Sequence, residues 1–166
     1  MRFDLSHFLI VLPQNFLTDT TPLRGENAVA AIITDENGRY LLQLRDDIPG
    51  IFYPGHWGCF GGAVGLGEEP AKALIRELDE ELEMRSTQIE EFVSLEFDLT
   101  RMGQKKIYRT YYRLDIRSDT ASQLVLHEGM AMRFFADREI FDLPNLTPYD
   151  SFALWLFAAR SRFHLT

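Results

Sequence analysis

Cysteine is nearly absent from this chain: Cys59 is the only one among 166 residues. A single thiol forms no internal disulfide, and a cysteine-based zinc site needs further ligands. Both features are therefore excluded. Sparse cysteine use is typical of a reducing compartment, so we expect a cytoplasmic protein.

Long hydrophobic runs are also missing. The apolar runs near the two ends of the chain, residues 8–13 and 152–159, fall well short of the ~20 apolar residues that a membrane-spanning helix needs. No small-residue cleavage site follows the first run, so it does not have the form of a signal peptide. We expect no membrane partner, and we interpret both runs as parts of a hydrophobic core.

Positive charge is scarce as well. The chain has 17 Lys and Arg against 25 Asp and Glu, which gives a formal net charge of −8. Binding to a DNA or RNA backbone requires a basic surface, so we expect no long nucleic acid as a partner. An acidic protein that meets a phosphorylated ligand needs a divalent cation, and clustered carboxylates hold such a cation.

Composition and length are otherwise those of an ordinary globular protein. Hydrophobic residues make up 46% and charged residues 25% of the chain, which argues against intrinsic disorder and fibrous structure. The length predicts a single domain over residues 1–166, with residues 1–23 as an N-terminal strand and loop extension.

Residue periodicity predicts an α+β fold. The expected strands are 8–12, 28–34, 40–45, 57–60, 89–99, 107–116, 124–126 and 130–135. The expected helices are 68–84, 137–141 and 148–163. Strands on both sides of a central helix, followed by a closing helix, predict a central mixed sheet with helices on its faces.

The closing helix is rich in apolar residues. Phe152, Leu156 and Ala159, with Trp155 beside them, have a spacing suited to packing on a sheet. Asp150, in the first turn, is expected to cap this helix rather than to bind a ligand.

The central helix, 68–84, carries two different faces. Its apolar face consists of Ala71, Leu74, Ile75, Leu78 and Leu82. On another face, Glu77, Glu80 and Glu81 stand at positions i, i+3 and i+4 and repel one another. An oxygen-ligated Mg²⁺ or Mn²⁺ would turn this repulsion into binding energy, whereas the simpler interpretation is a solvated acidic surface. Arg76 can orient these carboxylates through charged hydrogen bonds.

The residues before this helix favour the metal site over the solvated acidic surface. Gly61 and Gly62 end a strand, where glycines let backbone carbonyls approach a cation or a phosphate. The segment GAVGLGEEPAKALIRELDEELEM, from Gly62 to Met84, resembles the Nudix box, G-x5-E-x7-R-E-U-x-E-E-x-G-U, in which U is a bulky aliphatic residue. The fixed Gly, Glu, Arg, Glu, aliphatic, Glu and Glu all match, and a chance match has a probability on the order of 10⁻⁶. The late Gly is Glu83 here, so we expect the helix to run on or to end differently.

The resemblance implies a Nudix-type α/β/α sandwich and a hydrolase. Nudix enzymes cleave the pyrophosphate of a nucleoside diphosphate linked to a further group. They use divalent cations, usually Mg²⁺ and in some cases Mn²⁺, and water attacks phosphorus. The expected substrate is a small nucleotide, either a nucleotide sugar or a nucleoside triphosphate, and the aromatic loop before the box favours the nucleotide sugar.

The resemblance also implies roles for individual residues. The implied metal ligands are Glu77, Glu80, Glu81, Glu68 and the carbonyl oxygen of Gly61. Arg76 is the implied electrostatic partner of Glu77. The general base varies across the family, and Glu128 and Glu77 are the two candidates.

Candidates for substrate binding precede the box. Phe52, Tyr53 and Trp57 can stack on a base or line a sugar pocket, and Arg45 can meet a terminal phosphate. The alternative is that these side chains only pack a loop, with Arg45 at the surface.

Other polar residues carry weaker expectations. Arg24 is a further candidate phosphate contact, and His127 a candidate acid or base. Lys105, Lys106 and Arg109 are interpreted as the solvated tip of a hairpin.

Two alternatives to the hydrolase remain. The first is a Nudix-fold module that senses a nucleotide metabolite without turnover, and the second is an isomerase that acts on an isoprenoid diphosphate. The intact set of acids favours the hydrolase over the sensor, and no extra Cys and Glu machinery of the isomerase can be placed. A homodimer is possible, because Nudix enzymes are often dimers.

Overall fold

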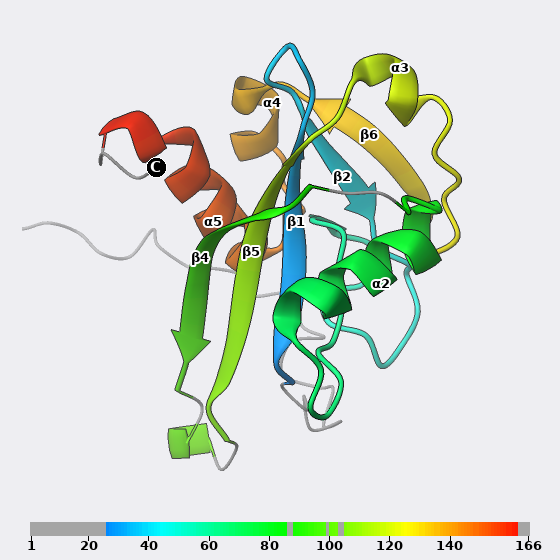
Figure 1. Cartoon of the computed structure of the whole chain (residues 1–166). Coiled ribbons are helices and arrows are strands. Elements are labelled where there is room, and N and C mark those ends of the chain that lie inside the picture. Colours follow the sequence, from blue (N-terminus) through cyan, green and yellow to red (C-terminus); the bar gives the residue numbers. More distant parts are fainter. Residues whose placement is uncertain (1–25, 86–87, 99, 103–104, 163–166) are drawn as a thin grey trace, which may run out of the picture.

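The computed structural model describes residues 26–85, 88–98, 100–102 and 105–162. The expected strand 8–12, the extension 1–23 and Arg24 lie outside these residues. Figure 1 shows a curved sheet with helices on both sides. Among the described residues, no helix has the length and hydrophobicity required to span a membrane.

The sheet has six strands among the described residues. The strands are β1 (Ala28–Thr34), β2 (Tyr40–Leu44), β3 (Trp57–Gly58), β4 (Glu90–Phe97), β5 (Ile107–Asp115) and β6 (Ala131–Phe135). β1 pairs in parallel with β5, and the other pairings are antiparallel. The expected mixed sheet is therefore confirmed.

The sheet opens between β1 and β2. All five residues of β2 pair with β6 along one edge. The other edge is shared, because Tyr40 and Leu41 pair with β1, whereas Gln43 and Leu44 pair with β3. The chain after β3 then continues along β1. The segment that leads into the acidic helix is thus wedged between two strands of the sheet.

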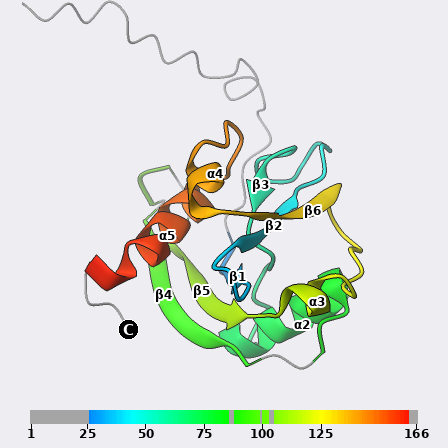
Figure 2. The ribbon, with the colours of Figure 1, turned by 90° about the horizontal axis from the view of Figure 1, so that it is seen from above.

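The helices cover both faces of the sheet (Figure 2). They are α2 (Pro70–Leu82), α3 (Ser118–Ala121), α4 (Asp137–Phe141) and α5 (Pro148–Ala158), and two 3-10 turns, η1 (Thr100–Met102) and η2 (Arg160–Arg162), complete the set. Strand β1 is apolar from Ala28 to Ile33 because it is buried on both sides. Val29 and Ile33 pack toward α2, and Ile32 packs toward α4 and α5. This arrangement confirms a sandwich with helices on both faces.

Three expectations about elements are wrong. Helix α5 ends at Ala158 and the 3-10 turn η2 follows at Arg160–Arg162, so the expected helix 148–163 is too long. Residues 124–126 form no strand, although Leu124 and Leu126 still pack against the core beneath α2. The expected face of α5 is also wrong, because Phe152 is 53% exposed while Ala153 and Phe157 are buried. Helix α5 is apolar almost all round, so its pattern alone does not determine which side packs on the sheet.

Candidate active site

Helix α2 presents the acidic residues and has well-defined ends. Pro70 occupies its first turn, where the missing N–H costs nothing. At the other end Glu83 adopts the left-handed conformation, with φ of 55° and ψ of 28°. The N–H of Met84 donates to the carbonyl of Leu78, which closes the helix as a glycine terminator would. The helix therefore stops at the position expected for the missing glycine and does not run on.

Arg76 gathers three carboxylates around one guanidinium. Its Nε and Nη2 donate to the two carboxylate oxygens of Glu68, each at 3.0 Å. Its Nη1 donates to Glu77 at 2.7 Å and to Glu80 at 3.1 Å, and Nη2 also donates to the carbonyl of Ala63. Arg76 and these three glutamates are called the Arg76 cluster. The expected pairing of Arg76 with Glu77 is present.

The Arg76 cluster also shapes the ionisation of its members. Hydrogen bonding to Arg76 lowers the pKa of Glu68. The pKa of Glu77 is raised, mainly because its carboxylate is partly buried and also because other carboxylates lie near it. Gly62 makes this burial possible, since a Cβ there would lie 2.5 Å from the Glu77 carboxylate.

Glu81 points away from the Arg76 cluster and into the sheet. Its carboxylate is held by the N–H of Gly61 at 2.9 Å and by Nε2 of Gln43 at 3.3 Å. Glu81 is only 4% exposed, and burial raises its pKa to about 7, with the charges of Glu77 and Glu128 adding to the effect. A buried carboxylate with no paired cation requires a nearby positive charge or a proton.

Glu128 joins this site from a distant part of the sequence. It is exposed, and its charge acts on both Glu77 and Glu81. The loop that carries it is anchored by the N–H of His127, which donates to the carbonyl of Glu81 at 2.9 Å. The structure thus brings Glu128 to the same region as the α2 carboxylates, while the ring of His127 contacts Glu83.

The donor set fits a hard divalent cation in its chemistry. Carboxylate oxygens are the ligands that Mg²⁺ and Mn²⁺ prefer, and this region holds three glutamates paired with Arg76 together with the nearby charges of Glu81 and Glu128. In the described part of the chain, however, no three acidic, His or Cys side chains already converge as a cation-binding group. Arg76 and Gly61 hold the carboxylates instead. A cation would bind by exchanging some of these contacts for its own.

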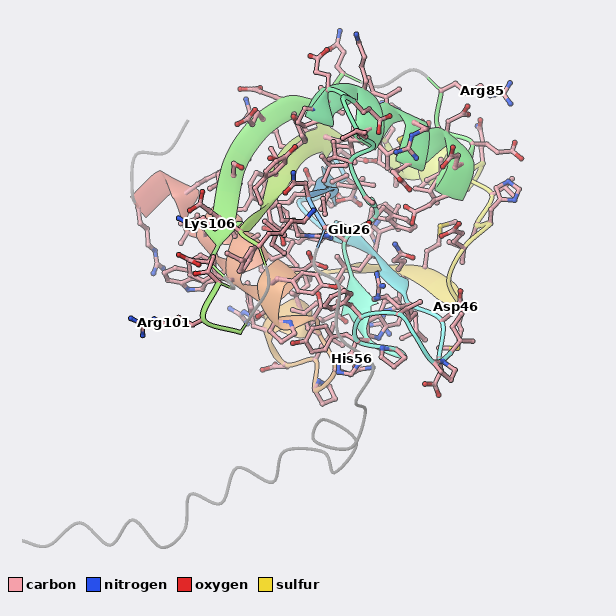
Figure 3. All side chains as sticks on the ribbon, turned by 90° about the horizontal axis from the view of Figure 1, so that it is seen from below. Glu26, Asp46, His56, Arg85, Arg101 and Lys106 are labelled. Carbon is pink, nitrogen blue, oxygen red and sulfur yellow. The ribbon has the colours of Figure 1, made fainter. Side chains whose placement is uncertain are left out.

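Three of the predicted substrate contacts, Arg45, Phe52 and Tyr53, lie in the loop between β2 and β3, and the fourth, Trp57, is the first residue of β3. Arg45 donates to the carbonyl of Phe52 at 2.8 Å, which braces this loop. Tyr53 packs edge-on against His56 and Tyr149, and Trp57 packs edge-on against Phe135 in the core. Figure 3 shows His56 and Asp46 at this end of the molecule. Substrate binding by Arg45, Phe52, Tyr53 and Trp57 stays a prediction.

The interpretation of Arg109 as part of a solvated hairpin tip is wrong. Figure 3 shows Lys106 and Arg101 at the outer end of β4 and β5, and Lys106 pairs there with Glu96. The Arg109 side chain is only 14% exposed and lies 3.3 Å from the Asp150 carboxylate. Residues two apart in a strand point to the same face, so Arg109 lies on the same face of β5 as the buried Tyr111. The sequence alone does not show which of the two faces is buried.

Asp150 is not a helix cap, contrary to expectation. Thr147 occupies the capping position, and the Asp150 carboxylate points into the protein. Gln43 was also missed, since an uncharged residue within a strand carries no functional signal. Both residues gain significance only from what the fold places beside them.

Comparison with known proteins agrees with this geometry. The NUDIX domain family model matches residues 25–156. An RNA pyrophosphohydrolase from Gluconacetobacter diazotrophicus is 36% identical over 69 residues, which are 40% of this chain and 41% of that protein. The match therefore spans less than half the length of that relative.

Solved structures agree on the fold. The MutT protein of Methanosarcina mazei Go1 superposes with a TM-score of 0.65 at 21% identity, over 82% of this chain and 94% of that one. The E. coli ORF135 protein gives 0.63 at 28% identity, over 81% and 89%. With the box on α2, the mixed sheet and a family model that matches most of its length, this chain belongs to the Nudix family.

Proposed function

We propose that this protein hydrolyses the pyrophosphate bond of a small nucleoside diphosphate derivative in a Mg²⁺-dependent reaction. The observation that carries the proposal is the surplus of carboxylates at the α2 site, where Arg76 pairs with three glutamates and the charges of Glu81 and Glu128 lie close by. This surplus costs stability unless a cation offsets it. A family whose members act on small nucleotide substrates supplies the matching ligand, because a pyrophosphate brings further negative charge to a bound cation.

The residues of the site have different proposed roles. When bound at these carboxylates, a divalent cation would supply positive charge against the pyrophosphate and would lower the pKa of a nearby water molecule. In the proposed mechanism Glu80 and Glu81 ligate the cation, Glu77 ligates it or acts as base, and Arg76 holds Glu77 and Glu68 in place. Supporting contacts from Glu68 and from the Gly61 carbonyl complete the proposed set of metal ligands.

Two carboxylates, Glu77 and Glu128, are the candidates for the general base that accepts the proton of the attacking water. Burial raises the pKa of Glu77, which makes its carboxylate a stronger base than an ordinary exposed glutamate. Glu128 is exposed and not held by Arg76, so it can reach a water molecule without breaking an ion pair. Both fit the proposal, and separate Gln variants distinguish them through the pH dependence of kcat.

The test is product release from a panel of nucleotides. We expect turnover of at least one nucleotide sugar, dinucleotide or nucleoside triphosphate with Mg²⁺, and none with EDTA. Glu81→Gln is expected to lower kcat by at least about 100-fold, because several kcal/mol of transition-state stabilisation depend on the cation. Asp79→Asn is the matched control on the same helix and should keep full activity, since the Asp79 carboxylate pairs with the exposed Arg85 and lies outside the Arg76 cluster.

A 5′-triphosphorylated RNA belongs in the panel because the matched relative is an RNA pyrophosphohydrolase. The net charge of −8 favours small nucleotides over long RNA. Saturable nucleotide binding without any turnover would contradict the hydrolase and support a metabolite-sensing module. Cytoplasmic residence and a homodimeric state remain predictions.

A further inference from the structure

A second polar cluster lies on the opposite side of the sheet, beneath α5. Asp150 is 1% exposed, yet both of its carboxylate oxygens are fully engaged. One oxygen accepts from Thr147 Oγ1 at 2.7 Å and from the N–H of Cys59 at 2.9 Å. The other accepts from the hydroxyl of Tyr111 at 2.9 Å and lies 3.3 Å from Nη2 of Arg109. These five residues are called the Asp150 network.

The contact with Cys59 differs from the other contacts of Asp150, because its donor is a backbone N–H group. β3 ends at Gly58, and the next contacts with β1 are made by the carbonyls of Phe60 and Gly62, which accept from the N–H groups of Ala31 and Val29. The N–H of Cys59 therefore has a side chain, Asp150, where a regular ladder would offer a strand carbonyl. Buried N–H groups need a hydrogen-bond acceptor, and the Asp150 carboxylate provides it in place of the carbonyl of a neighbouring strand.

The same peptide segment reaches the α2 site on its other side. The carbonyl of Cys59 is within 3.5 Å of Nε2 of Gln43, and that nitrogen is 3.3 Å from the Glu81 carboxylate. Two residues on, the N–H of Gly61 donates to Glu81 at 2.9 Å. A continuous chain of contacts thus runs from Asp150 through residues 59–61 to Glu81.

Close packing leaves this segment little freedom to absorb a change at Asp150. A Cβ at Gly58 would lie 2.7 Å from the Asp150 carboxylate. A Cβ at Gly61, whose φ is +131°, would lie 2.3 Å from the carbonyl oxygen of Val29. The chain here is pressed between Asp150 on one side and β1 on the other, so a shift at one end is transmitted along the backbone.

We propose that Asp150 is a positioning residue for the α2 site: by holding the N–H of Cys59 it sets the place of Gly61, and with Gln43 it sets the orientation of the Glu81 carboxylate across the sheet. This inference rests on the proposed function, in which Glu81 is a metal ligand. Outer groups that orient a ligand in this way typically change metal affinity or activity by about 10- to 100-fold when removed.

The experiment compares two variants of the same network. Asp150→Asn has the same shape but lacks the charge, and its amide has one acceptor oxygen where the carboxylate has two. Tyr111→Phe removes a hydrogen bond from the Asp150 oxygen that does not face Cys59, so it weakens the network without breaking the link to Gly61. Amide hydrogen exchange of Cys59 and Gly61 is measured without metal, and kcat, KM and the half-saturating Mg²⁺ concentration are measured with it.

In Asp150→Asn we expect faster exchange at both amides, kcat lower by about 10-fold or more, a higher Mg²⁺ requirement and a KM for the nucleotide within about 3-fold of wild type. Tyr111→Phe is expected to leave all four quantities near wild type, even where its unfolding free energy falls. Equal effects of both variants, or a normal Gly61 amide and normal kcat in Asp150→Asn, would overturn the positioning role. Absence of turnover in wild type would overturn the proposed function, while the exchange rates would still decide whether Asp150 positions Gly61.

Discussion

The α2 side and the α5 side of the sheet each place an arginine among acidic and polar groups, yet the two clusters differ in balance. In the Arg76 cluster one guanidinium, 38% exposed, serves three carboxylates, and Glu81 and Glu128 add further negative charge nearby. In the Asp150 network one carboxylate is met by an arginine, two hydroxyls and a backbone N–H. The Arg76 cluster requires a further cation to balance its negative charge, whereas the hydrogen bonds and the charge of the Asp150 carboxylate are already satisfied.

This difference separates function from structural support. A saturated buried network stabilises one conformation, and removing any member leaves a partner unsatisfied. A partly exposed cluster with excess negative charge can still bind a cation. Without a cation, the repulsion between its carboxylates destabilises the folded protein. Substitutions in the Asp150 network should therefore lower the unfolding free energy more than those in the Arg76 cluster, and the following predictions are ordered by expected size.

The largest change should come from truncating Asp150. Asp150→Ala leaves the buried Arg109 guanidinium, the Tyr111 hydroxyl and the Cys59 N–H without their shared acceptor. We expect the unfolding free energy to fall by about 3 to 5 kcal/mol, measured by denaturant titration. On the α2 side, Glu80→Ala should cost under about 1 kcal/mol because its ion pair is exposed. Similar costs for the two variants would remove the distinction.

The second prediction concerns pH. Burial raises the pKa of Glu81 to about 7 from 4.5, so in the metal-free protein the folded state holds a proton that the unfolded state has lost. Stability should fall as pH rises from about 4.5 to 7, by up to about 3 kcal/mol, and then level off. Glu81→Gln should flatten this slope in urea titrations across the range. Mg²⁺ should raise the stability of wild type at pH 7.5 but not that of the variant; an unchanged slope would contradict the burial argument.

A third prediction exchanges the arginines for lysines. Arg76→Lys loses the paired contacts of Nε and Nη2 with Glu68, so we expect kcat to fall by about 10-fold with little change in unfolding free energy. Arg109→Lys should lower the unfolding free energy by about 1 to 3 kcal/mol, because its site is buried. Activity assays and thermal unfolding of both variants test this crossed pattern, which identical profiles would refute.

The smallest effect should come from the end of α2. Glu83 adopts a left-handed conformation that favours glycine, with φ of 55°. Glu83→Gly should raise the unfolding free energy by about 0.5 to 1 kcal/mol and leave kcat unchanged. Leu82→Gly, inside the helix, is the opposite control and should be strongly destabilising because Leu82 is fully buried. A loss of stability in Glu83→Gly would mean that its contact with His127 outweighs the backbone cost.

Much of the fold follows from local pattern. The apolar run of β1, the acidic and apolar faces of α2 and the strands β4 and β5 were all predictable within two residues at each end. Residues 124–126 and the buried face of α5 were not. A short apolar segment does not distinguish a strand from core-packed loop, and an all-apolar helix has no face that its own sequence selects.

The carboxylates at the candidate site were predictable for a similar reason. Glu77, Glu80 and Glu81 share a helix, so their relation is fixed by the 3.6-residue repeat. The contacts of Arg76 with Glu68 and Glu77 join residues within nine positions of one another. Motif spacing captures such local geometry well.

The sequence by itself thus determined the family pattern, the extent of most strands and helices and the acidic face of α2, because each depends on residues close together in the chain. Tertiary structure alone decided that Glu81 turns inward to Gly61 and Gln43, that Glu128 arrives beside it, and that Asp150 binds the Cys59 peptide. Those contacts join segments up to 91 positions apart, and their existence depends on how β3 is inserted between β1 and β2. Local periodicity carries no information about that packing.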